Sequence, residues 1–220
     1  MTTTAPASGG WLSGLADWAV GLMETIGAPG AALAIALENL LPPLPSELIL
    51  PMAGFAASRG SFTIAEALIW TTLGSVVGAY LLYWIGRALG RDRTRRLFGR
   101  LPLVSPEDVD RVEAWFDRHG SKAVFFGRMV PVFRSVISIP AGVTAMPQSR
   151  FLTLTFAGSA IWNTIFVLAG YFLGEQWHVV EQYAGIFQKL VVAAIVVAVA
   201  IWLLKRIRAR RASRDQNPAA

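Results

Sequence analysis

Two apolar segments, residues 63–90 and 151–174, are each long enough to cross a lipid bilayer as a helix, which takes roughly 20 residues. Identical residues, mostly small ones, recur in both segments at one constant offset, with no gap between the first pair and the last. The pairs, each 84 positions apart, are Gly74 and Gly158, Ser75 and Ser159, Gly86 and Gly170, Leu89 and Leu173, and Gly90 and Gly174. This regularity predicts an internal repeat built around two membrane-spanning helices.

A shorter, proline-interrupted apolar segment precedes each span, at residues 31–57 and 123–146. Because proline breaks a helix and each half is too short to cross a bilayer, we expect two re-entrant helical hairpins. The two hairpins share one spacing, because Pro43 to Gly54 and Pro131 to Gly142 each span 11 positions. The offset between the hairpins is 88. The residues expected to break the hairpins or allow close packing are Pro43, Pro45, Pro51, Gly54, Pro131, Pro140 and Gly142.

The composition favours a membrane protein, because 54% of the residues are hydrophobic and only 15% are charged. Soluble domains carry about 25% charged residues. Since a bilayer requires backbone hydrogen bonds to be satisfied internally, the prediction is an all-α integral membrane protein. The chain has no cysteine, which excludes thiolate catalysis and cysteine-ligated metals.

The basic residues predict the orientation in the membrane. Nine of the 20 Lys and Arg residues lie between Arg87 and Lys122, and six more lie between Lys205 and Arg214. Basic segments stay on the cytoplasmic side, so the two spans run in opposite directions and the repeats are inverted. A basic tail after an apolar segment typically meets anionic lipid, and we expect no nucleic-acid binding. The expected location is the cytoplasmic (inner) membrane, crossed several times.

The predicted organisation has three parts. They are an N-terminal interfacial helix (1–27), a membrane domain (28–204) and a basic, disordered cytoplasmic tail (205–220). The membrane domain divides into a first repeat (28–90), a cytoplasmic amphipathic segment (91–123), a second repeat (124–174) and a last transmembrane helix (187–204).

Four ionisable residues lie inside the predicted hairpins: Glu38, Glu47, Arg128 and Arg134. A charge at bilayer depth costs about 2.5–3.5 kcal/mol on insertion scales, so such residues persist where they pair or reach water. With the offset of 88, each glutamate falls within two positions of an arginine. We therefore expect the acidic and basic pairs to face each other in a hydrated cavity. Two structural alternatives stay open: ion pairs that only hold the hairpins together, and side chains that extend to the membrane surface.

The chemistry of these residue types indicates an anionic substrate. Arginine binds phosphate oxygens through paired hydrogen bonds and stays charged, so Arg128 and Arg134 are the expected phosphate-binding residues. A carboxyl group withdrawn from water takes up a proton more readily, which makes Glu38 and Glu47 candidates for proton coupling or charge pairing. A phosphate head group could then occupy a polar site while its lipid tail stays in hydrocarbon.

These segments resemble the DedA family, also called SNARE-associated or VTT-domain proteins. The resemblance rests on LENLLPPLPSE (37–47), PMAGF (51–55) and FFGRMVPVFRSVISIPAG (125–142), and it covers about residues 28–175. It implies that Glu38, Glu47, Arg128 and Arg134 are essential, and that function depends on the proton motive force. Where the family often has aspartate in the first hairpin, this chain has Glu47, which keeps the charge but reaches further.

The resemblance also implies lipid translocation, and undecaprenyl phosphate recycling is the leading hypothesis. A glycerophospholipid flippase or scramblase and a small-anion or ion transporter are the alternatives, along with a purely structural role. We expect no enzyme, because a lipid phosphatase commonly relies on histidine, and His119 and His178 lie outside the hairpins. No metal site or cofactor is expected. The anticipated partners are a membrane lipid and protons, with homo-oligomerisation left open.

Overall fold

The computed structural model describes residues 11–40, 46–98, 106–131 and 133–173, together with five positions between 193 and 204. The predicted last transmembrane helix (187–204), apart from those five positions, and the tail (205–220) lie outside the described residues, as do Pro43 and Pro45. The helices are α1 (Trp11–Ile26), α2 (Ala28–Leu40), α3 (Ser46–Ser58), α4 (Ile64–Phe98), α5 (Pro106–Gly127), α6 (Phe133–Val136), α7 (Ser138–Val143) and α8 (Gln148–Leu173). The described part contains no strand, and the all-α prediction is confirmed for it.

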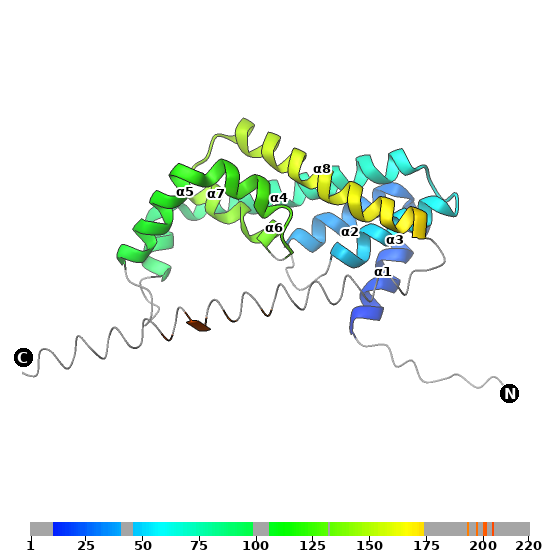
Figure 1. Ribbon diagram of the computed structural model, residues 1–220, viewed down its shortest axis with the longest axis horizontal. Helices are drawn as coiled ribbons and strands as arrows, with labels where there is room; N and C mark the ends of the chain where they lie inside the picture. Colours follow the sequence, from blue (N-terminus) through cyan, green and yellow to red (C-terminus); the bar gives the residue numbers. More distant parts are fainter. Residues whose placement is uncertain are drawn as a thin grey trace, which may run out of the picture.

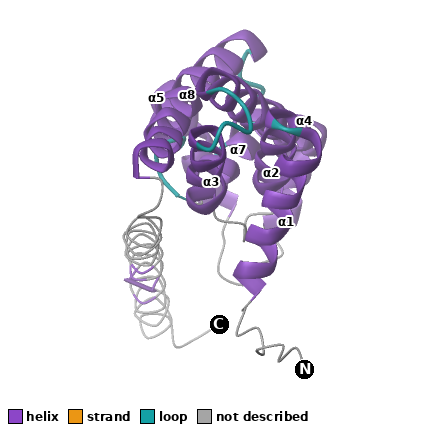
Figure 2. Cartoon of the chain, turned by 90° about the vertical axis from the view of Figure 1, so that its right-hand side faces the viewer, coloured by secondary structure: helices purple, strands orange, loops and turns teal. Residues whose placement is uncertain are grey.

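The two long helices α4 and α8 run along the length of the molecule in opposite directions (Figure 1). The short helices α1, α2 and α3 lie towards one end, and α5, α6 and α7 lie towards the other. Seen end-on, α3 and α7 lie between α8 on one side and α4 on the other (Figure 2). Each long helix therefore contacts short helices from both parts of the chain.

Apolar side chains cover the outer faces of α4 and α8. The exposed ones include Ile69, Val77, Leu81 and Ile85 on α4, and Phe156, Ile161, Ile165 and Phe172 on α8. Both helices have the length and composition of membrane spans, over Ile64–Thr94 and Gln148–Leu173. Water would not stabilise such surfaces, whereas lipid chains solvate them, so this is the arrangement of a helical membrane protein.

Helix α4 begins at a capping box and continues beyond its predicted end. The Thr63 backbone N–H donates to Glu66 Oε2 (2.7 Å), and the Glu66 N–H donates to Thr63 Oγ1 (3.2 Å). The sequence predicts an end at residue 90, but the helix resumes after Gly90 (φ 64°, ψ 171°) and reaches Phe98. Glycine tolerates this left-handed conformation, so one residue bends the helix without ending it. Beyond the bend, Arg91 forms an ion pair with Asp117 of α5 (3.1 Å).

Helix α5 joins two segments that the sequence analysis separates at residue 123. It starts at Pro106, where a proline ring costs no helical hydrogen bond, and runs without interruption to Gly127. No proline lies between these ends, and the one internal glycine, Gly120, packs against Phe116. The first half of the second predicted hairpin is therefore the end of a 22-residue helix.

The second half of each predicted hairpin packs closely against the long helix of the other repeat, a crossed contact between the repeats. A Cβ at Gly54 of α3 would overlap the Val167 carbonyl of α8, and a Cβ at Gly142 of α7 would overlap the Tyr83 carbonyl of α4. The glycines differ by 88 positions and their partners by 84, which are the two offsets found in the sequence. The same crossed contact therefore occurs once in each half of the fold.

A second pair of glycines makes the reciprocal contact from the long helices. Gly170 of α8 meets the backbone of Pro51 in α3, and Gly86 of α4 meets the backbone of Ile139 in α7. Because a side chain at any of these glycines would enter neighbouring backbone, the helices approach as closely as their main chains allow. Close helix contact through small residues is the usual way that helices pack within a membrane.

Candidate functional site

The four charged residues singled out from the sequence are all buried. Glu38 lies in the last turn of α2 and Glu47 in the first turn of α3, while Arg128 directly follows α5 and Arg134 lies in α6. Their exposed fractions are 4%, 5%, 1% and 2% respectively. All four side chains therefore lie inside the described fold.

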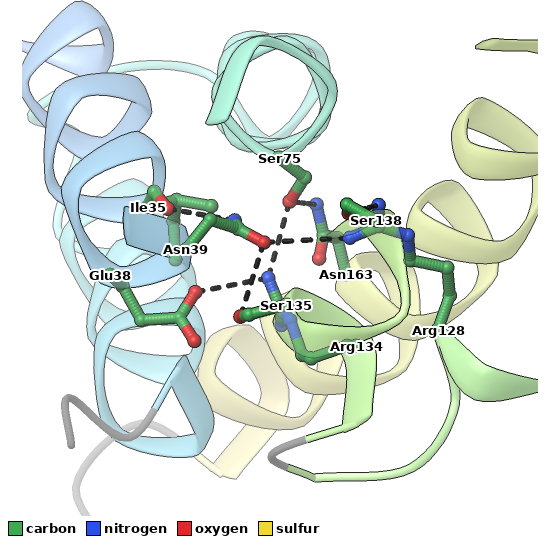
Figure 3. A network of polar contacts seen from close by, with 9 residues as sticks. All are labelled: Ile35, Glu38, Asn39, Ser75, Arg128, Arg134, Ser135, Ser138 and Asn163. Carbon is green, nitrogen blue, oxygen red and sulfur yellow. Dashed lines mark hydrogen bonds and ion pairs between the residues drawn. The ribbon is translucent and has the colours of Figure 1, made fainter. Parts of the chain in front are cut away.

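Glu38 and Arg134 form an ion pair within the fold (Figure 3). Glu38 Oε2 lies 3.2 Å from Arg134 Nη2, and both side chains are buried. The same guanidinium nitrogen donates to Ser75 Oγ of α4 (3.4 Å). The pair thus links α2 to α6, two helices from the two predicted hairpins, and both arginine contacts use one side of the guanidinium.

Arg128 has polar partners but no carboxylate. Its Nη2 donates to Ser138 Oγ (2.7 Å) and its Nη1 to Asn39 Oδ1 (3.5 Å), and its guanidinium carbon lies 5.9 Å from the centre of the Phe151 ring. Gly158 leaves room for this side chain, since a Cβ there would lie 2.9 Å from the Arg128 Cβ. Among the described residues, no carboxylate lies within ion-pairing distance of Arg128.

Neutral polar residues that the sequence analysis did not assign to the site complete the network. Ser75 Oγ also accepts a hydrogen bond from Asn163 Nδ2 of α8 (3.1 Å). Asn39 Oδ1 accepts a second one from Ser135 Oγ (3.4 Å), while Asn39 Nδ2 donates to the Ile35 carbonyl (2.9 Å). A usable signal was present: each is a polar residue within an apolar segment, and Ser75 belongs to the repeated Gly-Ser pair.

Several buried polar atoms of this network have no hydrogen-bond partner among the described residues. They are Arg128 Nε, Arg134 Nη1, Asn163 Oδ1 and Glu38 Oε2, the last of which contacts Arg134 only as an ion pair. An unpaired buried donor costs about 1–3 kcal/mol, and more when it is charged. Two guanidinium groups with spare donors in one buried network therefore form a place suited to an anionic acceptor.

Glu47 lies apart from the contacts that join the other three charges. It forms no ion pair with either buried arginine. Of the residues expected from the sequence to allow close packing, Gly54 and Gly142 make the crossed contacts described above. The described prolines are Pro51 and Pro140, inside α3 and α7, and Pro131, buried in the turn before α6.

Comparison with known proteins agrees with this architecture. A family model described as the VTT domain matches residues 44–172, more than half of the chain. The chain belongs to the DedA family of VTT-domain membrane proteins. The match begins shortly before α3, so it includes Glu47 and both buried arginines. Glu38 of α2 lies before it.

Curated relatives extend the DedA match over most of the chain. An alkaline phosphatase-like protein of Lactococcus lactis subsp. cremoris is 36% identical over 89% of this chain and 94% of its own. The undecaprenyl phosphate transporter A of Bacillus subtilis is 32% identical over 91% and 96%, and that of Staphylococcus aureus is 32% identical over 80% and 89%. No solved structure matches the chain.

Proposed function

We propose that this DedA protein translocates undecaprenyl phosphate across the cytoplasmic membrane, coupled to the proton motive force. The observation that carries the proposal is the pair of buried guanidinium groups with unpaired donors, Arg128 Nε and Arg134 Nη1. Arginine in an apolar fold needs an anionic or polar acceptor, and a phosphate monoester offers several oxygens in the geometry that guanidinium prefers. Two relatives named undecaprenyl phosphate transporter A support this choice of lipid.

In this proposal Arg128 and Arg134 bind the phosphate, while Glu38 and Glu47 carry the coupling proton. Arg134 is already paired with Glu38, so a phosphate competes with that carboxylate for the same guanidinium. Protonation of Glu38 would end the competition, since a neutral carboxyl no longer attracts the arginine as an ion. Proton uptake and phosphate binding would then favour the same state, which is the requirement for coupling.

The proposed topology places two inverted re-entrant hairpins around this network. The crossed contacts Gly54–Val167 and Gly142–Tyr83, related by the sequence offsets, support two equivalent halves. Inverted halves can exchange roles, which opens the central site to either face in turn. The short helices α2 and α3 suit a hairpin that enters and leaves the membrane on one side. The exposed apolar faces of the described fold are available for homo-oligomerisation.

The test is a vesicle assay that follows one lipid between leaflets. Purified protein is reconstituted with undecaprenyl phosphate, and a membrane-impermeant phosphatase added outside hydrolyses only the lipid that reaches the outer leaflet. We expect hydrolysis to continue beyond the outer-leaflet pool, and to accelerate under an imposed proton gradient. Hydrolysis that stops at the outer pool, as in protein-free vesicles, would exclude the proposed substrate.

A parallel vesicle series separates the alternatives. Fluorescent phosphatidylglycerol replaces undecaprenyl phosphate, and its transfer is followed by an impermeant quencher. Movement of the glycerophospholipid alone would assign the site to a flippase or scramblase instead. If neither lipid moves but an entrapped inorganic anion escapes, the protein would be a small-anion transporter.

A further inference from the structure

Two consecutive residues at the end of α2 contact the two buried arginines, and only one of them is charged. Glu38 pairs with Arg134 at 3.2 Å, and Asn39 accepts from Arg128 at 3.5 Å. Figure 3 shows both side chains directed from α2 towards the arginines. One arginine therefore has a carboxylate as its partner, whereas the other has a neutral amide.

The remaining surroundings of Arg128 do not supply the missing negative charge. Its other close contacts are the Ser138 hydroxyl (2.7 Å) and the face of Phe151, both neutral. The neighbouring ion pair contains one positive and one negative group, Arg134 and Glu38, which oppose one another. Because that pair is already neutral as a whole, Arg128 is a buried cation whose charge the described residues leave uncompensated.

We propose that Arg128 is the primary anion-binding group and that Asn39 keeps it available by being neutral. This inference rests on the proposed function and assigns different roles to the two arginines of its site. The phosphate of the lipid serves as the counter-ion of Arg128, close to the Ser138 hydroxyl and to Nε, which has no partner among the described residues. Arg134 stays paired with Glu38 until that carboxylate is displaced or protonated. Asn39 thus acts through Arg128, because its neutral amide leaves that arginine able to take an anion as its counter-ion.

The direct test is Asn39→Asp, which changes the charge beside Arg128 with almost no change in shape. Binding of undecaprenyl phosphate to purified protein in phosphatidylcholine nanodiscs is measured by native mass spectrometry. A permanent carboxylate near 3.5 Å would neutralise Arg128, so we expect binding at least about tenfold weaker than in the wild type. Binding within twofold of the wild type would overturn the inference.

Two control variants separate the charge from other effects. Asn39→Ala removes the hydrogen bond to Arg128 but adds no charge, so its loss of binding should be clearly smaller than that of Asn39→Asp. Equal losses in both variants would mean that the amide itself matters, which contradicts the inference. Ser58→Asp adds the same charge at an exposed position at the end of α3 and should bind like the wild type.

A matched pair of arginine variants tests these different roles through the melting temperature of the protein, without any ligand. Arg134→Gln leaves the buried Glu38 carboxylate without its charged partner and should lower the melting temperature. Arg128→Gln removes an uncompensated buried charge and should lower it less, or raise it. If Arg128→Gln is the more destabilising of the two, Arg128 has a counter-ion within the protein and the inference is wrong.

The outcomes distinguish this inference from the function on which it rests. If wild-type protein neither binds nor moves undecaprenyl phosphate, the proposed function fails. If the wild type does both and Asn39→Asp does so equally well, only the role of Asn39 and Arg128 fails. Inorganic phosphate in excess serves as competitor: displacement of the lipid would show that the site recognises free phosphate as well as the lipid head group.

Discussion

Glu38 Oε2 and Arg134 Nη2 lie 3.2 Å apart in the described fold, on side chains that are 96 positions apart in sequence and almost fully buried. The two residues come from α2 and α6, so their pairing joins the two predicted hairpins. A buried ion pair contributes little net stability, because desolvation offsets the attraction, but removal of one partner is costly. The pair is therefore weak evidence for stability, and its role in function is a proposal that variants of the two residues test.

The first prediction concerns the stability of single and double variants of this pair. Glu38→Gln and Arg134→Gln should each destabilise the protein, by about 3–5 kcal/mol, because each leaves one buried charge without its partner. The double variant should be more stable than either single variant. Thermal unfolding in detergent measures all three, and additive losses in the double variant would show that the two side chains are not coupled.

The second prediction concerns the crossed glycine contacts. Gly54→Ala and Gly142→Ala should each destabilise by about 1–3 kcal/mol, because the new methyl group meets backbone that cannot yield easily. Gly21→Ala in α1 is the matched control, since nothing lies within 4 Å of its added Cβ. Melting temperatures of the three variants are compared; a change in the α3 and α7 variants no larger than in the control would contradict the crossed packing.

The third prediction concerns the orientation of the two long helices. The chain has no cysteine, so Ser58→Cys and Ser149→Cys can each be labelled alone. Both positions are exposed, one before α4 and one at the start of α8. With the basic residues inside, an impermeant maleimide should label residue 58 from outside the cell and residue 149 only after permeabilisation. Labelling of both from the same side would exclude the proposed inverted topology.

The fourth prediction concerns the geometry of Arg128 rather than its charge. Arg128→Lys keeps the charge, but one ammonium group cannot reproduce the separate contacts to Ser138 and Asn39. We expect about tenfold weaker apparent affinity for undecaprenyl phosphate in vesicles, the loss of about one hydrogen bond to a charged group. Arg150→Lys, at an exposed position, is the control, and an equal effect in both would remove the special role of Arg128.

Sequence patterns predicted the parts of the fold that depend on periodicity and composition. Apolar length predicted both long helices, and the cost of burying charge singled out Glu38, Glu47, Arg128 and Arg134 as candidate site residues. The prediction of the two long apolar helices is confirmed, because a bilayer restricts what an apolar segment can form.

The pairing within the site could not be predicted in the same way. The offset of 88 indicates which positions are equivalent, and equivalence is different from contact. It relates Glu38 to the neighbourhood of Arg128, yet Glu38 pairs with Arg134. Asn39 and Asn163 are polar residues within apolar segments, which indicates burial in a polar site but not which side chains they contact. The observed end of α4 lies beyond the predicted one because Gly90 bends the helix without ending it. Helix α5 continues past the predicted boundary at residue 123 because no proline interrupts it.

Translocation by the Glu38→Gln/Arg134→Gln double variant tests the central claim most directly, because this variant should fold without either buried charge of the ion pair. Equal amounts of double variant and wild type are reconstituted with undecaprenyl phosphate, and outer-leaflet hydrolysis is followed in each. Transfer between leaflets should be fast with the wild type and no faster with the double variant than in protein-free vesicles. Transfer at the wild-type rate by the double variant would show that the buried ion pair has no part in moving the lipid.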